Sequence, residues 1–154
     1  MTLEELEAKI KVLEDIEAIK RLKGKYGYFV DTRNWQDFMN LVMDDAIWDF
    51  GSLGLYKGKR EILRFTRDII LDTYSFMMHN FFNIFVEVQG NEATGEWYFL
   101  VPATNDKEKR AEWLAGKYEE EYVKVDGEWK FKKVTARINF IAPYDEGWAK
   151  AKTV

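Results

Sequence analysis

The pattern of apolar residues changes once along the chain, near residue 75, and this change limits the folds open to it. Apolar residues recur at helical spacing before it, whereas long runs rich in β-branched and aromatic residues follow it. These runs cover 76–88, 92–104, 111–125 and 129–141. Turn-forming residues join them at 89–91, 105–106 and 126–127, as in antiparallel hairpins. Helices followed by a strand meander predict an α+β fold, with helices on one face of a bent, mostly antiparallel sheet.

Three helices are predicted before the change. The first opens with a capping box of Thr2 and Glu5 and runs to about residue 32, with a change in the phase of its apolar stripe near Asp15. Gly24 and Gly27 each weaken this helix by about 1 kcal/mol relative to alanine, so we expect another element, such as the sheet, to pack closely there. The other two helices are expected at 35–41 and 59–71, with a short strand at 46–50 between them.

Length and composition are those of one domain covering residues 1–154. Of these residues, 47% are hydrophobic and 16% are aromatic, which suits a cavity lined with rings beneath a curved sheet. The formal net charge of −4 arises from scattered charges of both signs, so no nucleic acid partner is expected. No stretch reaches about 18 consecutive apolar residues and the amino terminus is charged, so we expect no membrane partner and a soluble, cytoplasmic protein.

The chain has no cysteine and one histidine. Disulfides, thiolate nucleophiles and sulfur-ligated metals are therefore excluded, as is a site with several histidines, and only oxygen-ligated metals stay open. We expect neither a metal nor another cofactor. His79 is then the one imidazole in the chain that could take part in acid–base chemistry.

Motifs along nearly the whole chain match one family. They lie at 16–22 with Tyr26 and Asp31, at 35–38, 44–46, 58 and 79, and at 93–95, 116–122 and 126–130. With these motifs the chain resembles the SnoaL-like branch of the nuclear-transport-factor-2-like superfamily, in particular the bile acid 7α-dehydratase group. The resemblance implies a cystatin-like, cone-shaped fold whose bent sheet encloses an apolar pocket. Dehydratases, dehydrochlorinases, isomerases, cyclases and non-catalytic modules share that fold, so the fold does not decide the function.

The resemblance also implies a catalytic site. Four residues fall where the bile acid 7α-dehydratase group has its catalytic residues, namely Tyr26, Asp31, His79 and Arg137. A carboxylate at one ring nitrogen of His79 would fix the tautomer and stabilise the imidazolium, which makes the other nitrogen a general base. Tyr26 and Arg137 would then stabilise the developing negative charge or the leaving group.

Each of these residues also has a purely structural interpretation. A single histidine in a strand is often only partly buried, Asp31 can cap a helix end, and Tyr26 can pack in the core. Tyr26 and Asp31 lie about 140° apart on a regular helix, so their pairing requires the helix to end or loosen before Asp31. Arg137 belongs to a polar alternation in the last run that equally suits a polar oligomer face.

Aromatic residues and one amide are candidates for binding a flat, largely apolar substrate. They are Trp48, Phe50, Tyr56, Asn83, Trp97, Phe99, Trp113 and Tyr118. Most of the rings are expected to pack in the core while a few touch the ligand. The carboxylates of 119–121 are better explained by a strand that faces solvent or another subunit, with Glu120 on the opposite face from its neighbours.

Three functions are compatible with these residues. The first is a cofactor-independent lyase of the dehydratase type, acting by acid–base elimination on a small hydrophobic, steroid- or polyketide-like compound with an activating carbonyl. The second is an isomerase with the same Asp–His pair, and the third is a non-catalytic module that binds a ligand or joins subunits. A homodimer or homotrimer through the sheet face is expected. The distance from the Asp31 carboxylate to the His79 ring separates the enzymes from the module.

Overall fold

The computed structural model describes residues 1–151. Its amino-terminal helix, α1 (Leu3–Asp31), is continuous. The expected capping box is present, because the Thr2 amide donates to Glu5 Oε2 at 2.8 Å and the Glu5 amide donates to Thr2 Oγ1 at 3.1 Å. Asp15 does not interrupt the helix. Its carboxylate is buried and accepts a hydrogen bond from Trp129 Nε1 at 2.9 Å.

The remaining elements follow the expected order. Helices α2 and α3 span Trp35–Asn40 and Lys59–Thr73, and a 3-10 turn, η1, spans Gly51–Leu53. The strands are β1 (Val42–Asp49), β2 (Leu55–Lys57), β3 (Tyr74–Met77), β4 (Asn80–Gln89), β5 (Glu92–Asn105), β6 (Arg110–Val125) and β7 (Glu128–Pro143). Three details differ from the prediction: β1 is longer, β2 is additional, and the first expected run is split into β3 and β4 at residues 78–79.

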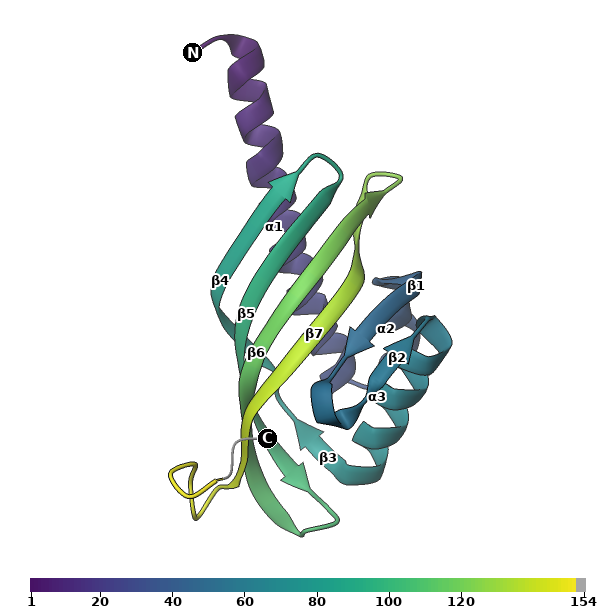
Figure 1. The fold of residues 1–154 in the computed structure, drawn as a ribbon, viewed down its shortest axis with the longest axis vertical. Coiled ribbons are helices and arrows are strands. Elements are labelled where there is room, and N and C mark those ends of the chain that lie inside the picture. The colour runs from purple at the N-terminus through teal and green to yellow at the C-terminus, as the bar shows by residue number, and fades with distance from the viewer. Residues whose placement is uncertain (152–154) are drawn as a thin grey trace.

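One strongly bent sheet contains all seven strands (Figure 1). The order is β2-β1-β7-β6-β5, and both β3 and β4 pair with β5, along different parts of its length. Every pairing is antiparallel except that of β1 with β7, which is parallel. The β6–β7 register shifts at 115–116 and again at 121–122, and such irregularities increase the bend of a sheet. The predicted α+β fold is confirmed.

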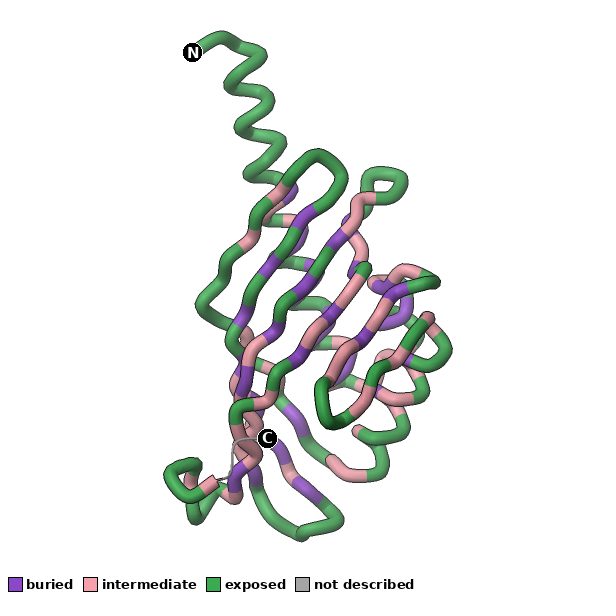
Figure 2. Tube along the Cα trace, viewed as in Figure 1, coloured by how far each residue is buried: buried purple, intermediate pink, exposed green. Residues whose placement is uncertain are grey.

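The core lies between the sheet and the helices. Buried and exposed residues alternate strictly over 92–99 of β5, so one face of the sheet packs inward and the other faces out. Only the second half of α1 joins this core, because residues 1–14 are all exposed and project beyond the sheet (Figure 2). Within residues 1–151, no helix has both the length and the apolar character that a membrane crossing needs.

Candidate active site

The end of α1 meets the break between β3 and β4 in a carboxylate–histidine pair. Asp31 Oδ1 lies 2.6 Å from His79 Nδ1, and Asp31 Oδ2 accepts a hydrogen bond from the His79 backbone amide at 2.8 Å. Residue 79 belongs to no strand, which leaves its amide free for the carboxylate. The two contacts fix the carboxylate relative to the ring, and only 7% of the His79 side chain is exposed.

The carboxylate dictates how the His79 ring is protonated. An ionised carboxylate only accepts hydrogen bonds, so the neutral ring carries its hydrogen on Nδ1 and leaves the Nε2 lone pair free. The 2.6 Å distance from His79 Nδ1 to Asp31 Oδ1 is within hydrogen-bonding reach, as the elimination mechanism requires of a base held by a carboxylate. The catalytic role itself stays a prediction.

His79 lines a cavity of about 210 Å³ between the sheet, α1 and α3. Most of the wall is apolar and comes from α3 and from β5, β6 and β7, including Phe65, Phe99 and Ile138. Polar groups are few: the imidazole, three tyrosine phenols and the hydroxyls of Thr66 and Thr73. An apolar enclosure with a few converging polar groups is typical of a small-molecule site.

Tyr26 also lines the cavity, from the inner face of α1. Its ring meets the His79 ring edge-on, with centroids 6.2 Å apart, and lies 6.1 Å from that of Tyr118. The helix does not end before Asp31, as the pairing was expected to require; instead the imidazole contacts Tyr26 with its ring and Asp31 with Nδ1. Burial raises the pKa of the Tyr26 and Tyr118 phenols far above the usual value. Both are therefore neutral hydrogen-bond donors rather than bases.

A fully buried ion pair lies behind these two phenols. Lys23 Nζ is 2.5 Å from Glu120 Oε1, and neither side chain is more than 1% exposed. The ammonium lies 3.6 Å from the Tyr118 ring centroid and 4.3 Å from that of Tyr26, which is cation–π geometry. Burial lowers the pKa of Lys23 to about 8, and attraction to Glu120 opposes this shift.

This ion pair was not among the candidates predicted from the sequence. Glu120 does lie on the opposite face from Glu119 and Glu121, but that face is the core and not solvent or another subunit. Its carboxylate accepts a hydrogen bond from the Tyr122 hydroxyl, which in turn accepts one from Trp97 Nε1 at 2.9 Å. The available signal was the alternation along the strand, which places Glu120 on the same face as Tyr122, two residues further on.

Arg137 does not reach the cavity, so the placement implied by the resemblance is wrong for this residue. Its neighbours Ala136 and Ile138 line the cavity, and alternation along β7 turns Arg137 to the outer face. There its guanidinium contacts the Asp49 carboxylate at 3.1 and 3.3 Å, and half of its side chain is exposed. The alternative interpretation, a polar outer face, agrees with this position.

Some of the candidates for substrate binding line the cavity and others do not. Phe50, Phe99 and Tyr118 line the cavity. The others do not: Trp48 and Trp97 are buried elsewhere in the core, Tyr56 stacks on Phe65 at 4.0 Å, Trp113 packs on Tyr144, and Asn83 is exposed. A bulge between Phe82 and Phe85 gives Asn83 a φ of 54°, and this breaks the inward–outward alternation of β4 at Asn83.

Three polar residues of the cavity wall were absent from the sequence candidates, namely Thr66, Thr73 and Tyr74. Thr66, on α3, is 6% exposed, and its buried hydroxyl has no hydrogen-bond partner in the described part of the chain. Buried polar groups are normally paired, so a hydroxyl left over in a cavity wall is available to a ligand. In the sequence, Ile62, Phe65 and Ile69 recur at helical spacing and indicate that this face of α3 packs inward, but this spacing does not single out Thr66.

Gly27 brings α1 against the residues around His79, and its replacement should disturb the site. A Cβ at this position would lie 2.8 Å from Phe81 Cε2 and 3.1 Å from His79 Cβ. We expect Gly27→Ala to lower the free energy of unfolding by about 1–3 kcal/mol through overpacking. Gly24→Ala is the matched control, because nothing lies within 4 Å of that Cβ, and it should stabilise the helix by about 0.5–1 kcal/mol. Urea unfolding of both variants measures this; equal effects would contradict the close approach at Gly27.

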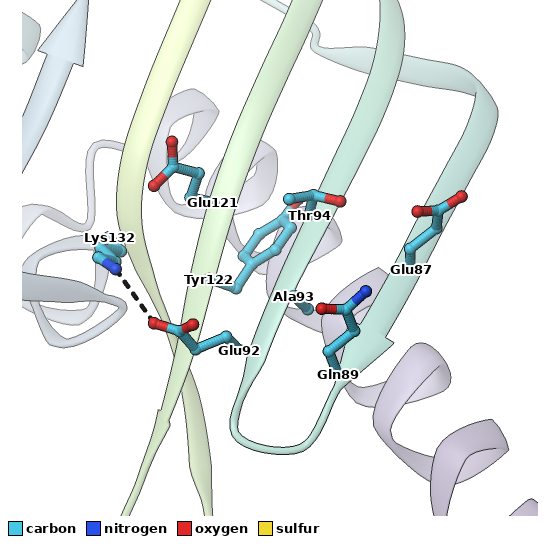
Figure 3. A pocket seen from close by; sticks show the side chains of 8 residues that line it. All are labelled: Glu87, Gln89, Glu92, Ala93, Thr94, Glu121, Tyr122 and Lys132. Atoms are coloured by element: carbon cyan, nitrogen blue, oxygen red, sulfur yellow. Dashed lines mark hydrogen bonds and ion pairs between the residues drawn. The ribbon is translucent and has the colours of Figure 1, made fainter.

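Another hollow lies at the β4–β5 hairpin and differs in character (Figure 3). It has a volume of about 300 Å³ and is lined by exposed polar side chains, including Glu87, Glu121 and Lys132. Lys132 Nζ contacts Glu92 Oε1 at 3.3 Å across it. Because it is open to solvent and holds no histidine, it is a weaker candidate for acid–base chemistry than the cavity at His79.

Comparison with known proteins identifies the family of this chain. Residues 11–135 match the SnoaL-like domain. Gamma-hexachlorocyclohexane dehydrochlorinase of Sphingobium indicum is 26% identical over 115 residues, which cover 74% of each chain. The structure of hexachlorocyclohexane dehydrochlorinase LinA-type3 from Novosphingobium barchaimii superposes with a TM-score of 0.82 at 25% identity, covering 95% of this chain and 98% of that one.

A proposed scytalone dehydratase from Novosphingobium aromaticivorans superposes with a TM-score of 0.79 at 26% identity, covering 86% of this chain and 89% of the other. These distant relatives are lyases or lyase-like proteins, and the cone-shaped architecture expected from the sequence is confirmed. The family match spans well over half of the chain. The chain therefore belongs to the SnoaL-like family of nuclear-transport-factor-2-like proteins.

Proposed function

We propose that this protein is a cofactor-independent lyase that removes a proton and a leaving group from adjacent carbons of a compact, largely apolar ring compound. The observation that carries the proposal is the Asp31–His79 pair, with its 2.6 Å contact and with His79 in the wall of an apolar cavity. The lyase chemistry of the distant relatives supports the reaction type. The Asp31–His79 pair is the support for the proposal that comes from this chain itself and not from its relatives.

In the proposed reaction, His79 Nε2 takes the proton from a carbon next to an activating group. The electron pair of that C–H bond becomes the new double bond, and the leaving group departs from the neighbouring carbon with its bonding electrons. Chloride leaves as it is, whereas hydroxide needs a proton, which the new imidazolium or a phenol of Tyr26 or Tyr118 can donate. Asp31 stabilises the imidazolium while the proton is held.

The size of the cavity favours a small substrate over a steroid-like one. Pockets for drug-sized ligands are about 300–1,000 Å³, and this cavity measures about 210 Å³. A single ring with small substituents suits that volume better than a four-ring steroid. The apolar wall fits an uncharged compound, because a charged group would lose its hydration there without gaining a partner.

An isomerase is the second candidate, and the position of Arg137 favours it. With Arg137 on the outer face, the cavity lining formed by residues 1–151 offers no guanidinium or ammonium to a departing anion. Moving a proton between two carbons needs only the base and a neutral donor that stabilises the enolate, and His79 with Tyr26 supplies both.

A panel of three probes separates these possibilities. γ-Hexachlorocyclohexane reports elimination by chloride release, β-hydroxycyclohexanone reports it by the absorbance of the conjugated enone, and β,γ-cyclohexenone reports isomerisation by the same absorbance. We expect turnover in one of the first two assays. Turnover of β,γ-cyclohexenone alone would favour the isomerase. Binding of the product enone without turnover of any probe would leave the non-catalytic module.

Thr66 gives a prediction that separates ligand binding from stability. An unpaired buried polar group costs about 1–3 kcal/mol, so Thr66→Val should raise the free energy of unfolding of the ligand-free protein by about 1 kcal/mol. The same change should weaken binding of α,β-cyclohexenone, because its carbonyl loses a donor. Thermal unfolding without and with the enone measures both effects, and Thr66→Ser, which keeps the hydroxyl, is the control. A valine variant that is less stable without ligand would contradict the unpaired state of the hydroxyl.

A further inference from the structure

The part of α1 that projects beyond the sheet carries an apolar stripe with no partner within the described residues. The stripe consists of Leu3, Leu6, Ile10 and Leu13, which are between 40% and 72% exposed. At 100° per residue, its centre lies about 170° from that of the core-facing residues Ile19, Leu22, Tyr26 and Val30. The stripe therefore lies on the side of α1 opposite to the side that packs on the chain's own sheet.

The spacing of the stripe is that of a coiled-coil seam. Leu3 and Ile10 occupy a positions of a heptad, and Leu6 and Leu13 occupy d positions. The seam ends there, because the next two seam positions hold Glu17 and Lys20. We propose that residues 3–14 of α1 form a parallel, in-register coiled-coil contact with the same segment of a second copy of this chain.

The charged residues beside the seam favour a second copy of the same helix as the partner, in the parallel orientation. Glu7 and Glu14 lie at e positions on one side of the seam, and Lys9 lies at the g position on the other. In a parallel pair, Lys9 of one helix faces Glu14 of the other, twice by symmetry. An antiparallel pair would instead bring Lys9 near the second Lys9 and Glu7 near the second Glu7. Opposite charges therefore meet only in the parallel arrangement.

The segment is already ordered for this contact. Isolated helices shorter than about 12–15 residues are marginal in water, but residues 3–14 continue the helix that is anchored in the core from Asp15 onward. The capping box at Thr2 and Glu5 holds the exposed end. Because the seam and the core-facing stripe lie on opposite sides of α1, the two domains would sit on the outside of the pair without obstructing it.

The natural absence of cysteine makes cross-linking a direct test. Leu6→Cys, at a d position, should form a disulfide-linked dimer under mild oxidation, at least about tenfold faster than Ala8→Cys, which faces away from the seam. When Leu6→Cys and Ile10→Cys are mixed, most disulfides should join two chains of the same variant, because each seam position faces its own copy in a parallel, in-register pair. Preferred links between unlike variants indicate an antiparallel pair and overturn the proposal.

Mass measurement by light scattering provides the second test. Leu6→Glu with Ile10→Glu should dissociate the assembly without unfolding the domain, because these side chains lie outside the core of the single chain, and circular dichroism checks that the fold is kept. Lys9→Glu should weaken association by about fivefold, and adding Glu14→Lys should restore it. An unchanged mass in the glutamate variant, whether from a monomer or from assembly through the sheet face, overturns the proposal.

Discussion

Replacing His79 with alanine is expected to lower the rate of elimination by about 100- to 10,000-fold, the usual contribution of a general base. The proposed proton acceptor, His79 Nε2, is lost, and no other histidine, lysine or carboxylate lines the cavity among the described residues. Turnover of whichever probe is active in the three-probe panel measures the effect. Added imidazole should restore part of the activity, because the variant leaves a space of the same shape in the cavity wall. Loss of activity through unfolding alone would not respond to imidazole.

Asp31→Asn tests the other half of the pair. The amide is nearly isosteric with the carboxylate but is neutral, so it no longer stabilises the imidazolium and can favour the wrong tautomer. We expect a loss of similar size, about 100- to 10,000-fold in kcat, with a smaller change in KM. Activity within threefold of the natural protein would remove the pair from the mechanism.

Arg137→Gln is the informative control in the same assay. The structure places Arg137 on the outer face with Asp49, so the variant should keep activity within a few-fold of the natural protein. A loss as large as that of His79→Ala would show that the guanidinium reaches the substrate after all.

The elements that could be predicted from the sequence are those that local pattern determines. Alternation and turn residues located β5, β6 and β7 to within a few residues, and the capping box located the start of α1. The same alternation also determines on which face of the sheet Arg137 and Glu120 lie. Arg137 was nevertheless assigned by family resemblance, and Glu120 by the assumption that charged residues face out.

Other features have no local signal. The parallel pairing of β1 with β7 joins segments about 90 residues apart, and the bulge at Asn83 shifts a face without a change in hydrophobic pattern. The Asp31–His79 contact spans 48 residues, and periodicity did not reveal it; the family resemblance did. The cavity volume depends on how α3 packs over the sheet, which no pattern within α3 determines.

Lys23→Met is expected to be among the most destabilising single substitutions in the chain. It leaves the Glu120 carboxylate buried without its ammonium partner, and breaking a buried pair in this way costs about 3–5 kcal/mol. For a domain of this size, that corresponds to a fall in melting temperature of roughly 6–20 °C. Lys25→Met is the matched control, because Lys25 lies on the exposed side of the same helix turn and should change stability by less than about 0.5 kcal/mol.

The double variant Lys23→Met/Glu120→Met should recover most of this loss. Two apolar side chains remove both charges from the core, and replacing a whole buried pair is often neutral or stabilising by about 1–4 kcal/mol. Recovery will be incomplete, because the Tyr122 hydroxyl loses its acceptor, although it still accepts from Trp97 Nε1. Urea unfolding of the two single variants and the double variant gives the coupling energy. Losses that simply add would mean that the two charges do not stabilise each other.

The double variant also tests whether the Lys23–Glu120 pair positions residues that line the cavity. The Lys23 ammonium lies against the Tyr26 and Tyr118 rings, both of which line the cavity, so its removal leaves these rings without a charged neighbour that holds their position. A double variant that folds normally but loses turnover would therefore assign the pair a positioning role. If the double variant instead keeps the turnover of the natural protein, the pair has no positioning role at the cavity and contributes only to the packing of the core.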